Sequence, residues 1–134
     1  MTPLHGIRVL DLTGYLMGPF ATQILGDMGA DVIKVEPVEG DLVRAIGPTR
    51  SPGMGGIFQQ NNRNKRSIVL DLKQAAGRDA VLRLAENADI FIYNVRPAAM
   101  ARLGLSYEAV SAANPAIVYV GAVGFGQDGP YAAK

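Results

Sequence analysis

The chain has 134 residues, of which 49% are hydrophobic and 19% charged. Thirteen Lys and Arg residues against twelve Asp and Glu leave a formal net charge of +1, so charge points to neither nucleic acid nor a membrane surface as a partner. The absence of cysteine and the single histidine exclude a disulfide framework, thiolate catalysis and a His-rich metal site, and we expect no metal.

The start of the chain shows no basic segment followed by a long apolar stretch, and no apolar run approaches the ~18 residues of a membrane span. We therefore expect a cytoplasmic, globular protein with residues 1–134 in one domain.

The first third of the chain predicts a βαβ unit. Residues 7–12 (IRVLDL) are a short run of branched apolar side chains and predict a buried strand. A helix is expected to open at Gly18-Pro19, because proline suits the first helical turn, and to end at Gly29. Residues 31–36 (DVIKVE) predict a second, parallel strand. Four apolar residues recur at helical spacing and are expected to face the sheet: Phe20, Ile24, Leu25 and Met28.

Residues 37–66 are rich in glycine and proline and predict a long loop. A loop of this length is usually functional or mobile. Arg63, Lys65 and Arg66 are expected just ahead of the next strand, where they are either solvated charges or a phosphate contact.

The second half of the chain alternates strands and helices. We expect strands at residues 67–72, 89–93 and 116–121, and helices at 74–87, 97–103 and 106–113, the last with Ser106 as its N-cap. The order predicts an α/β fold: a Rossmann-like, mostly parallel sheet with helices on both faces.

Ligands of such sheets bind beyond the carboxyl ends of the strands. Asn94 and Arg96 follow the strand at 89–93, and Arg102 lies six residues later. Guanidinium groups match phosphate oxygens, so the sequence predicts a crevice for a phosphate-bearing ligand.

Several other features have two interpretations. Residues 124–129 (GFGQDG) match G-x-G-x-x-G, but Pro130 follows where a helix would have to begin, which favours a loop. The turn around Gly14 and Gly18 is either a tight turn or an anion site at a helix N-terminus. Asp11 is either a carboxylate of a functional site or a structural residue that binds loop amides, and His5 is expected at the surface.

Nine sequence strings, in order, resemble the amino-terminal part of the family III CoA-transferases. They include GIRVLDLT, LGDMGADVIKVEP, NRNKRSIVLDLK, ADIFIYNVRP and GFGQDGPYA. The resemblance implies an enzyme that moves coenzyme A between an acyl-CoA and a free carboxylic acid. Because the family also contains alpha-methylacyl-CoA racemase, a 2-methylacyl-CoA racemase or epimerase is the alternative.

The resemblance also implies which residues line CoA. In formyl-CoA transferase they lie in the loop after the first strand, at the tip of the LDLK strand, after the fourth strand and in an R-x-G segment. Leu16 stands where that enzyme has a glutamine, so formyl-CoA is not expected as the substrate. The matching positions here are Gly14, Tyr15, Leu16, Met17, Leu70, Asn94, Val95, Arg96 and Arg102.

The family's catalytic aspartate lies downstream of the GPYA segment, beyond Lys134, so no residue of this chain is expected to be catalytic. The resemblance therefore implies the amino-terminal part of a longer enzyme, whose relatives are interlocked homodimers. The remaining alternative is an inactive fragment that at most binds CoA.

Overall fold

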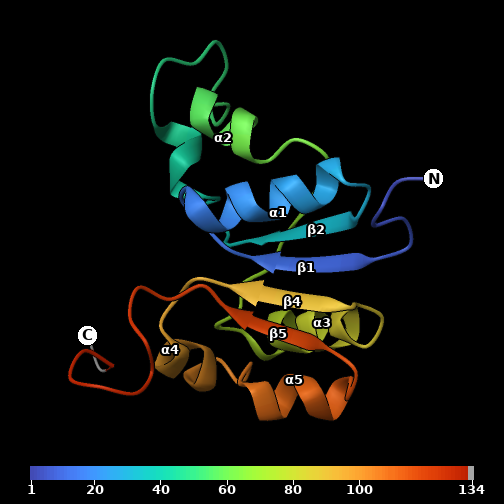
Figure 1. The fold of residues 1–134 in the computed structure, drawn as a ribbon. Coiled ribbons are helices and arrows are strands. Elements are labelled where there is room, and N and C mark those ends of the chain that lie inside the picture. The colour runs from blue at the N-terminus through green and yellow to red at the C-terminus, as the bar shows by residue number, and fades with distance from the viewer. Residues whose placement is uncertain (133–134) are drawn as a thin grey trace.

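The computed structural model describes residues 1–132 and contains a parallel sheet with the strand order β3-β2-β1-β4-β5 (Figure 1). Every neighbouring pair of strands runs parallel. This confirms the α/β class, and the order is the one that begins the Rossmann fold. The strands are β1 (Arg8–Leu12), β2 (Asp31–Glu36), β3 (Lys65–Val69), β4 (Ile90–Tyr93) and β5 (Val118–Gly121).

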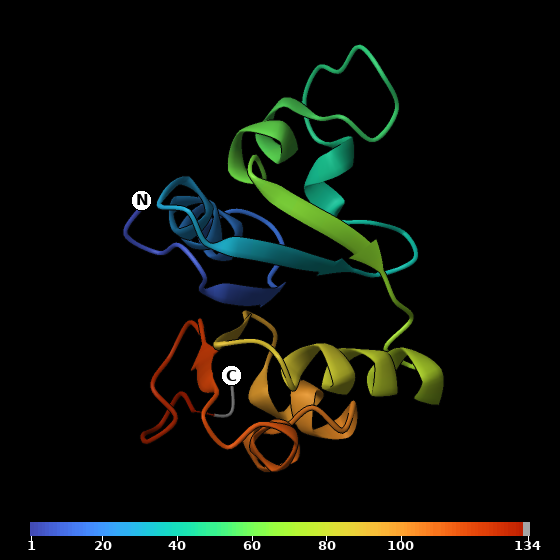
Figure 2. The same cartoon turned by 90° about the vertical axis from the view of Figure 1, so that its right-hand side faces the viewer.

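Helices cover both faces of the sheet (Figure 2). One face carries α1, and the other carries α3, α4 and α5, while α2 and the 3-10 helix η1 lie beyond the β3 edge. The bounds are α1 (Met17–Asp27), η1 (Leu42–Ala45), α2 (Gly56–Asn61), α3 (Ala75–Ala85), α4 (Pro97–Arg102) and α5 (Tyr107–Ala113).

Successive strand residues point to opposite faces, so β1 contributes to two cores. Leu10 belongs to the larger one, beneath α3, α4 and α5, together with Phe91 and Leu105. Val9 belongs to the smaller one beneath α1, together with Val32. The sheet thus packs between two apolar layers, which hold its carboxyl edge in place.

Two elements within residues 37–66 were not expected. Asp41 caps η1, because its side chain accepts a hydrogen bond from the Val43 amide at 3.2 Å, and α2 follows Gly55. The strand after them begins at Lys65, two residues before the predicted start, so Lys65 and Arg66 belong to β3. The early start of β3 depends on its pairing with β2, where Lys65 lies opposite Val32, and a local pattern does not reveal such a partner.

The predicted sheet-facing side of α1 was wrong for three of its four residues. Phe20, Ile24 and Met28 are 47%, 42% and 40% exposed, and Leu25 packs against the smaller core. The buried residues of α1 are small or polar instead: Gly18, Pro19, Thr22, Gln23 and Gly26. Small side chains let the helix axis approach the sheet, and this leaves an apolar stripe of α1 on the surface.

Candidate functional site

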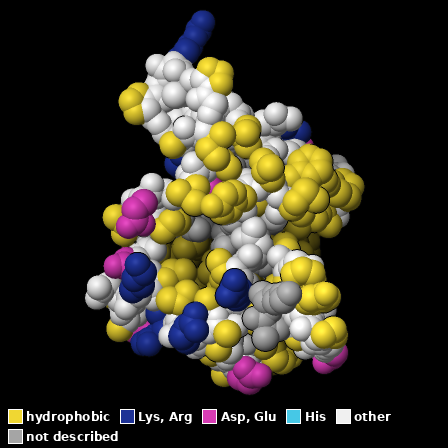
Figure 3. Space-filling view, turned by 90° about the vertical axis from the view of Figure 1, so that its left-hand side faces the viewer, with side chains coloured by type: hydrophobic (Ala, Val, Ile, Leu, Met, Phe, Trp, Pro, Cys, Tyr) yellow, Lys and Arg dark blue, Asp and Glu magenta, His cyan; other side chains and the backbone are white. Residues whose placement is uncertain are grey.

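The carboxyl ends of the strands share one edge of the sheet, which lies on the side of the molecule shown in Figure 3. Hydrophobic side chains line a hollow on this side, and Lys and Arg side chains lie near its lower rim. Because parallel sheets bind ligands beyond this edge, the hollow is the candidate site.

Two adjoining cavities form the centre of this edge. The loop cavity, of about 280 Å³, is lined by the turn at Gly14 and Tyr15 and by Asn94. The slot cavity, of about 310 Å³, is lined mainly by apolar residues such as Leu70 and Leu103. They form a continuous depression because they share five lining residues: Leu12, Val35, Glu36, Pro37 and Val95.

The slot cavity continues into a basic cavity of about 290 Å³. Lys73, Arg78 and Arg102 line it, and Leu72 and Leu103 line both cavities. The Arg78 side chain also runs close to the backbone at Gly104. Arg78 is paired with Asp79 at 2.9 Å, so Lys73 and Arg102 are the cations that we consider for a ligand here. Two cations at the end of an apolar slot suit a ligand with an uncharged arm and a phosphate-bearing end.

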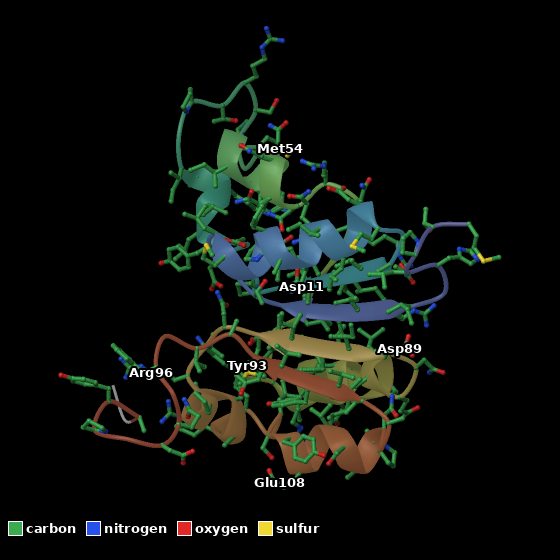
Figure 4. The ribbon with its side chains drawn as sticks, in the orientation of Figure 1. Asp11, Met54, Asp89, Tyr93, Arg96 and Glu108 are labelled. Carbon is green, nitrogen blue, oxygen red and sulfur yellow. The ribbon has the colours of Figure 1, made fainter. Side chains whose placement is uncertain are left out.

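A smaller outer cavity, of about 190 Å³, lies on the other side of Asn94 and Val95, which line it together with Arg96 and Phe125. Figure 4 shows Arg96 at the carboxyl edge, whereas Asp89 lies at the opposite end of the sheet. Arg96 thus lines a different cavity from Arg102, although the two are close in sequence.

Asn94 holds the turn after β1 through both polar groups of its side chain. Its Oδ1 accepts a hydrogen bond from the Gly14 amide at 3.0 Å, and its Nδ2 donates to the Gly14 carbonyl at 2.8 Å. This residue, expected from the sequence to contact a ligand, thus also fixes the backbone that lines the loop cavity.

Asp11 is fully buried between α1 and β1 (Figure 4). Its carboxylate accepts hydrogen bonds from the Thr13 amide at 2.9 Å and from the Thr22 hydroxyl at 2.6 Å, and it pairs with Lys65 at 3.0 Å. Burial lowers the pKa of Lys65, and the nearby Asp11 carboxylate opposes that shift. Of the two interpretations of Asp11, the structure supports the structural one.

A second buried ion pair joins Lys34 of β2 to Asp41, with side chains only 1% and 3% exposed. Lys34 Nζ lies 2.9 Å from Asp41 Oδ2 and 2.7 Å from the Thr13 carbonyl oxygen. Asp41 Oδ1 accepts a hydrogen bond from the Tyr15 amide at 3.3 Å. The pair therefore connects β2 with the turn after β1.

Next to this pair, Glu36 binds Arg44 through two hydrogen bonds of 2.7 Å and accepts a third from the Ser67 hydroxyl. Burial raises the pKa of Glu36, but these donors and the Asp41 amide outweigh it and lower the pKa to about 2. Arg44 also lies over the Phe58 ring at 3.6 Å, which ties η1 to α2.

The cations near the start of β3 do not contribute to the site. Arg63 pairs with Asp27, Arg66 pairs with Asp31, and Lys65 pairs with Asp11. Each is neutralised by a carboxylate within the chain, which argues against the phosphate-contact interpretation.

The structure places most of the residues expected from the sequence at the candidate site, but on different cavities. Leu16 and Met17 are the exceptions: they are 47% and 79% exposed and line none of the four cavities described for residues 1–132. The others divide as follows: Gly14 and Tyr15 at the loop cavity, Leu70 at the slot, Asn94 and Val95 at both the loop and outer cavities, Arg96 at the outer cavity, and Arg102 at the basic cavity.

Four charged residues of the site were not singled out from the sequence: Lys34, Asp41, Lys73 and Arg78. Lys73 had a usable signal, because it follows the apolar end of the third strand and so falls at the carboxyl edge. Lys34 interrupts an apolar strand, which suggests a buried charge but does not name its partner. Arg78 reaches the site from α3 only through the packing of that helix.

Within residues 1–132, no group of three or more His, Asp or Glu side chains is placed to hold a metal ion. No helix in this part of the chain has the length and apolar character needed to cross a membrane.

Comparison with known proteins identifies related sequences over nearly the whole chain. A family model for CoA-transferase family III matches residues 4–134. The chain is 47% identical to a succinate–glutarate CoA-transferase of Agrobacterium fabrum, over 97% of this chain and 34% of that protein. It is 45% identical to a succinyl-CoA:glutarate CoA-transferase of Mus musculus, over 97% of this chain and 30% of that protein.

Solved structures also match this chain over nearly its whole length. A CAIB/BAIF family protein from Brucella suis matches with a TM-score of 0.93 and 44% identity, over 98% of this chain and 36% of that one. A short chain dehydrogenase/reductase family protein matches with a TM-score of 0.53 and 18% identity, which shows the fold alone. The chain thus spans about a third of the length of the relatives it matches, 34% and 36% of the first-named protein and structure.

Proposed function

The chain belongs to CoA-transferase family III, and from this membership we propose that it supplies the CoA-binding part of an enzyme that moves CoA between an acyl-CoA and a free carboxylic acid. The observation that carries the proposal is the apolar slot cavity that opens into the basic cavity. CoA has a matching form, because a long, uncharged pantetheine arm joins its thiol to a phosphate-bearing nucleotide.

We orient CoA with its phosphates at the basic cavity, beside Lys73 and Arg102. The thioester end then lies toward the loop cavity. Lys34, a cation that lines the loop cavity, is paired with Asp41 and so offers no free charge to a phosphate. At Gly14 the turn instead presents backbone without a side chain, which allows close approach of the reacting end.

We assign no residue of this chain to the making or breaking of bonds. In the proposed reaction, a carboxylate contributed by another part of the enzyme attacks the acyl-CoA carbonyl and receives the acyl group as a mixed anhydride while the CoA thiolate leaves. The residues described here bind and orient CoA during this exchange.

The similar proteins named above are CoA-transferases whose names give succinate or succinyl-CoA and glutarate, which supports CoA transfer over racemisation. We therefore propose a short dicarboxylic acid as the acceptor and the CoA thioester of a second short dicarboxylic acid as the donor.

The proposal is tested by titrating the protein with CoA in a calorimeter. We expect binding, and we expect Arg102→Ala to weaken it about tenfold, because a charge-assisted contact to phosphate contributes on the order of 1.5 kcal/mol. Arg83→Ala is the matched control, since Arg83 is exposed on α3 and lines none of the four cavities described for residues 1–132. A folded protein that ignores millimolar CoA, or an equal loss in both variants, would contradict the proposal.

A further inference from the structure

The backbone of the turn after β1 is held by side chains at five successive polar groups. Asp11 accepts from the Thr13 amide, and Lys34 donates to the Thr13 carbonyl. Asn94 binds both the amide and the carbonyl of Gly14. Asp41 then accepts from the Tyr15 amide. A turn fixed by β1, β2, the residue after β4 and the loop before η1 has little freedom left to rearrange when a ligand arrives.

Tyr15 adopts a left-handed backbone conformation, with φ of 68°. This conformation is unfavourable for a bulky residue and persists where surrounding contacts impose it. The Tyr15 side chain is 56% exposed and lines the loop cavity, so the conformation is not maintained by burial of the ring. The bond from its amide to Asp41 is the contact that acts directly on this residue.

Lys34 and Asp41 contribute little to stability by being charged. A buried ion pair loses two hydration shells, and replacing it with apolar residues of similar volume is often neutral or stabilising. The pair does, however, supply two of the five bonds to the turn, at the Thr13 carbonyl and the Tyr15 amide. Its geometry therefore accounts for the shape of the turn better than for the stability of the fold.

We propose that the buried Lys34–Asp41 pair is a positioning element that presets the turn at residues 13–15 in the shape that CoA requires. This inference rests on the proposed CoA-binding function. Asp41 holds the Tyr15 amide, and Lys34 both neutralises Asp41 and holds the Thr13 carbonyl. Neither residue needs to touch CoA.

Two double variants separate positioning from charge. Lys34→Met/Asp41→Leu removes both charges and leaves the Tyr15 amide without its acceptor. Lys34→Gln/Asp41→Asn is equally uncharged but retains a side-chain N–H donor for the Thr13 carbonyl and a side-chain oxygen at the Asp41 position. The measurements are the CoA dissociation constant, the amide hydrogen exchange of Gly14 and Tyr15 by NMR, and thermal unfolding to verify the fold.

We expect the Leu variant to bind CoA at least tenfold more weakly and to exchange the Tyr15 amide faster, while the Asn variant stays within about threefold of the wild type for CoA. Equal CoA binding by the Leu variant and the wild type, or an equal loss in both variants, would overturn the inference. A wild-type protein that does not bind CoA would contradict the proposed function instead. In that case, the amide exchange rates of Gly14 and Tyr15 in the two variants would show whether the pair holds the turn.

If the Leu variant fails to fold, amide exchange in the wild-type protein still tests the inference. A preset turn has slow exchange at Gly14 and Tyr15 before CoA is added, and CoA slows it little further. Fast exchange in the free protein with strong protection only on binding would show that CoA, and not the ion pair, orders the turn.

Discussion

At the scale of single residues, Glu36 gives a stability prediction that depends on pH. Its side chain is 2% exposed, and its hydrogen bonds lower its pKa to about 2 from an ordinary value of 4.5. A lowered carboxylate pKa contributes stability that is complete above pH 4.5 and is lost as the pH falls toward 2. The shift corresponds to about 3 kcal/mol at neutral pH.

We therefore predict that Glu36→Gln lowers the free energy of unfolding by about 3 kcal/mol at pH 7, and that the deficit shrinks as the pH falls toward 2. Urea unfolding of both proteins across this pH range measures the difference. Glu39→Gln is the control, because Glu39 is exposed three residues after the strand. Parallel stability curves for the wild type and Glu36→Gln would show that the Arg44 contact does not lower this pKa.

At the scale of elements, sequence patterns predicted the sheet well and the sheet-facing side of α1 poorly. The strand at residues 31–36 was predicted with its observed bounds, because a branched apolar run after a glycine stop has few alternatives. The exposed side of α1 was mistaken for its buried side, because the helix packs through glycine, proline and threonine. A hydrophobicity pattern does not show that a helix can pack closely against a sheet through small residues.

The candidate site, like the fold, could be predicted from the sequence only in part. Asn94 could be placed at the carboxyl edge from the sequence, because it directly follows a predicted parallel strand, whereas Arg102 was expected there from the family resemblance. Lys34, Asp41 and Arg78 could not, since each reaches the site through a long-range contact.

The close packing of α1 gives a prediction for Gly18. A Cβ atom at this position would lie 2.4 Å from Thr13 Cβ, so one of the two elements would have to move. We predict that Gly18→Ala costs about 1–3 kcal/mol of unfolding free energy despite the higher helix propensity of alanine. The shift in urea midpoint at constant slope measures the cost.

Gly56→Ala is the matched control for this substitution. Gly56 begins α2, and a Cβ atom there would have no neighbour within 4 Å. Its midpoint is expected to stay the same or rise slightly. Two glycine variants with the same midpoint would mean that α1 does not depend on close approach to Thr13.

At the scale of the whole molecule, the two faces of the sheet are covered unequally. The layer of α3, α4 and α5 encloses a large core, whereas α1 turns an apolar stripe to solvent. Hydrophobic side chains also gather on the adjoining side in Figure 3. Exposed apolar patches of this kind generally mark surfaces that another surface covers.

We predict from this stripe that the chain self-associates, and that Phe20→Ser/Ile24→Ser shifts it toward the monomer. Phe20 and Ile24 are 47% and 42% exposed, so a large part of each is available to a second copy. Association of the double variant therefore loses the burial of the exposed part of two large side chains in each copy, on the order of 1–3 kcal/mol per copy if that part is fully covered. Sedimentation velocity over a range of concentrations measures the shift.

Val38→Ser provides the control for lost apolar surface in general, because Val38 is 65% exposed and lies in the loop after β2, outside the α1 stripe. Thermal unfolding of the double variant verifies that it keeps the fold. A wild-type chain that sediments as a monomer at all concentrations would contradict the prediction. So would association that weakens equally in the control, because the α1 stripe would then have no special part in it.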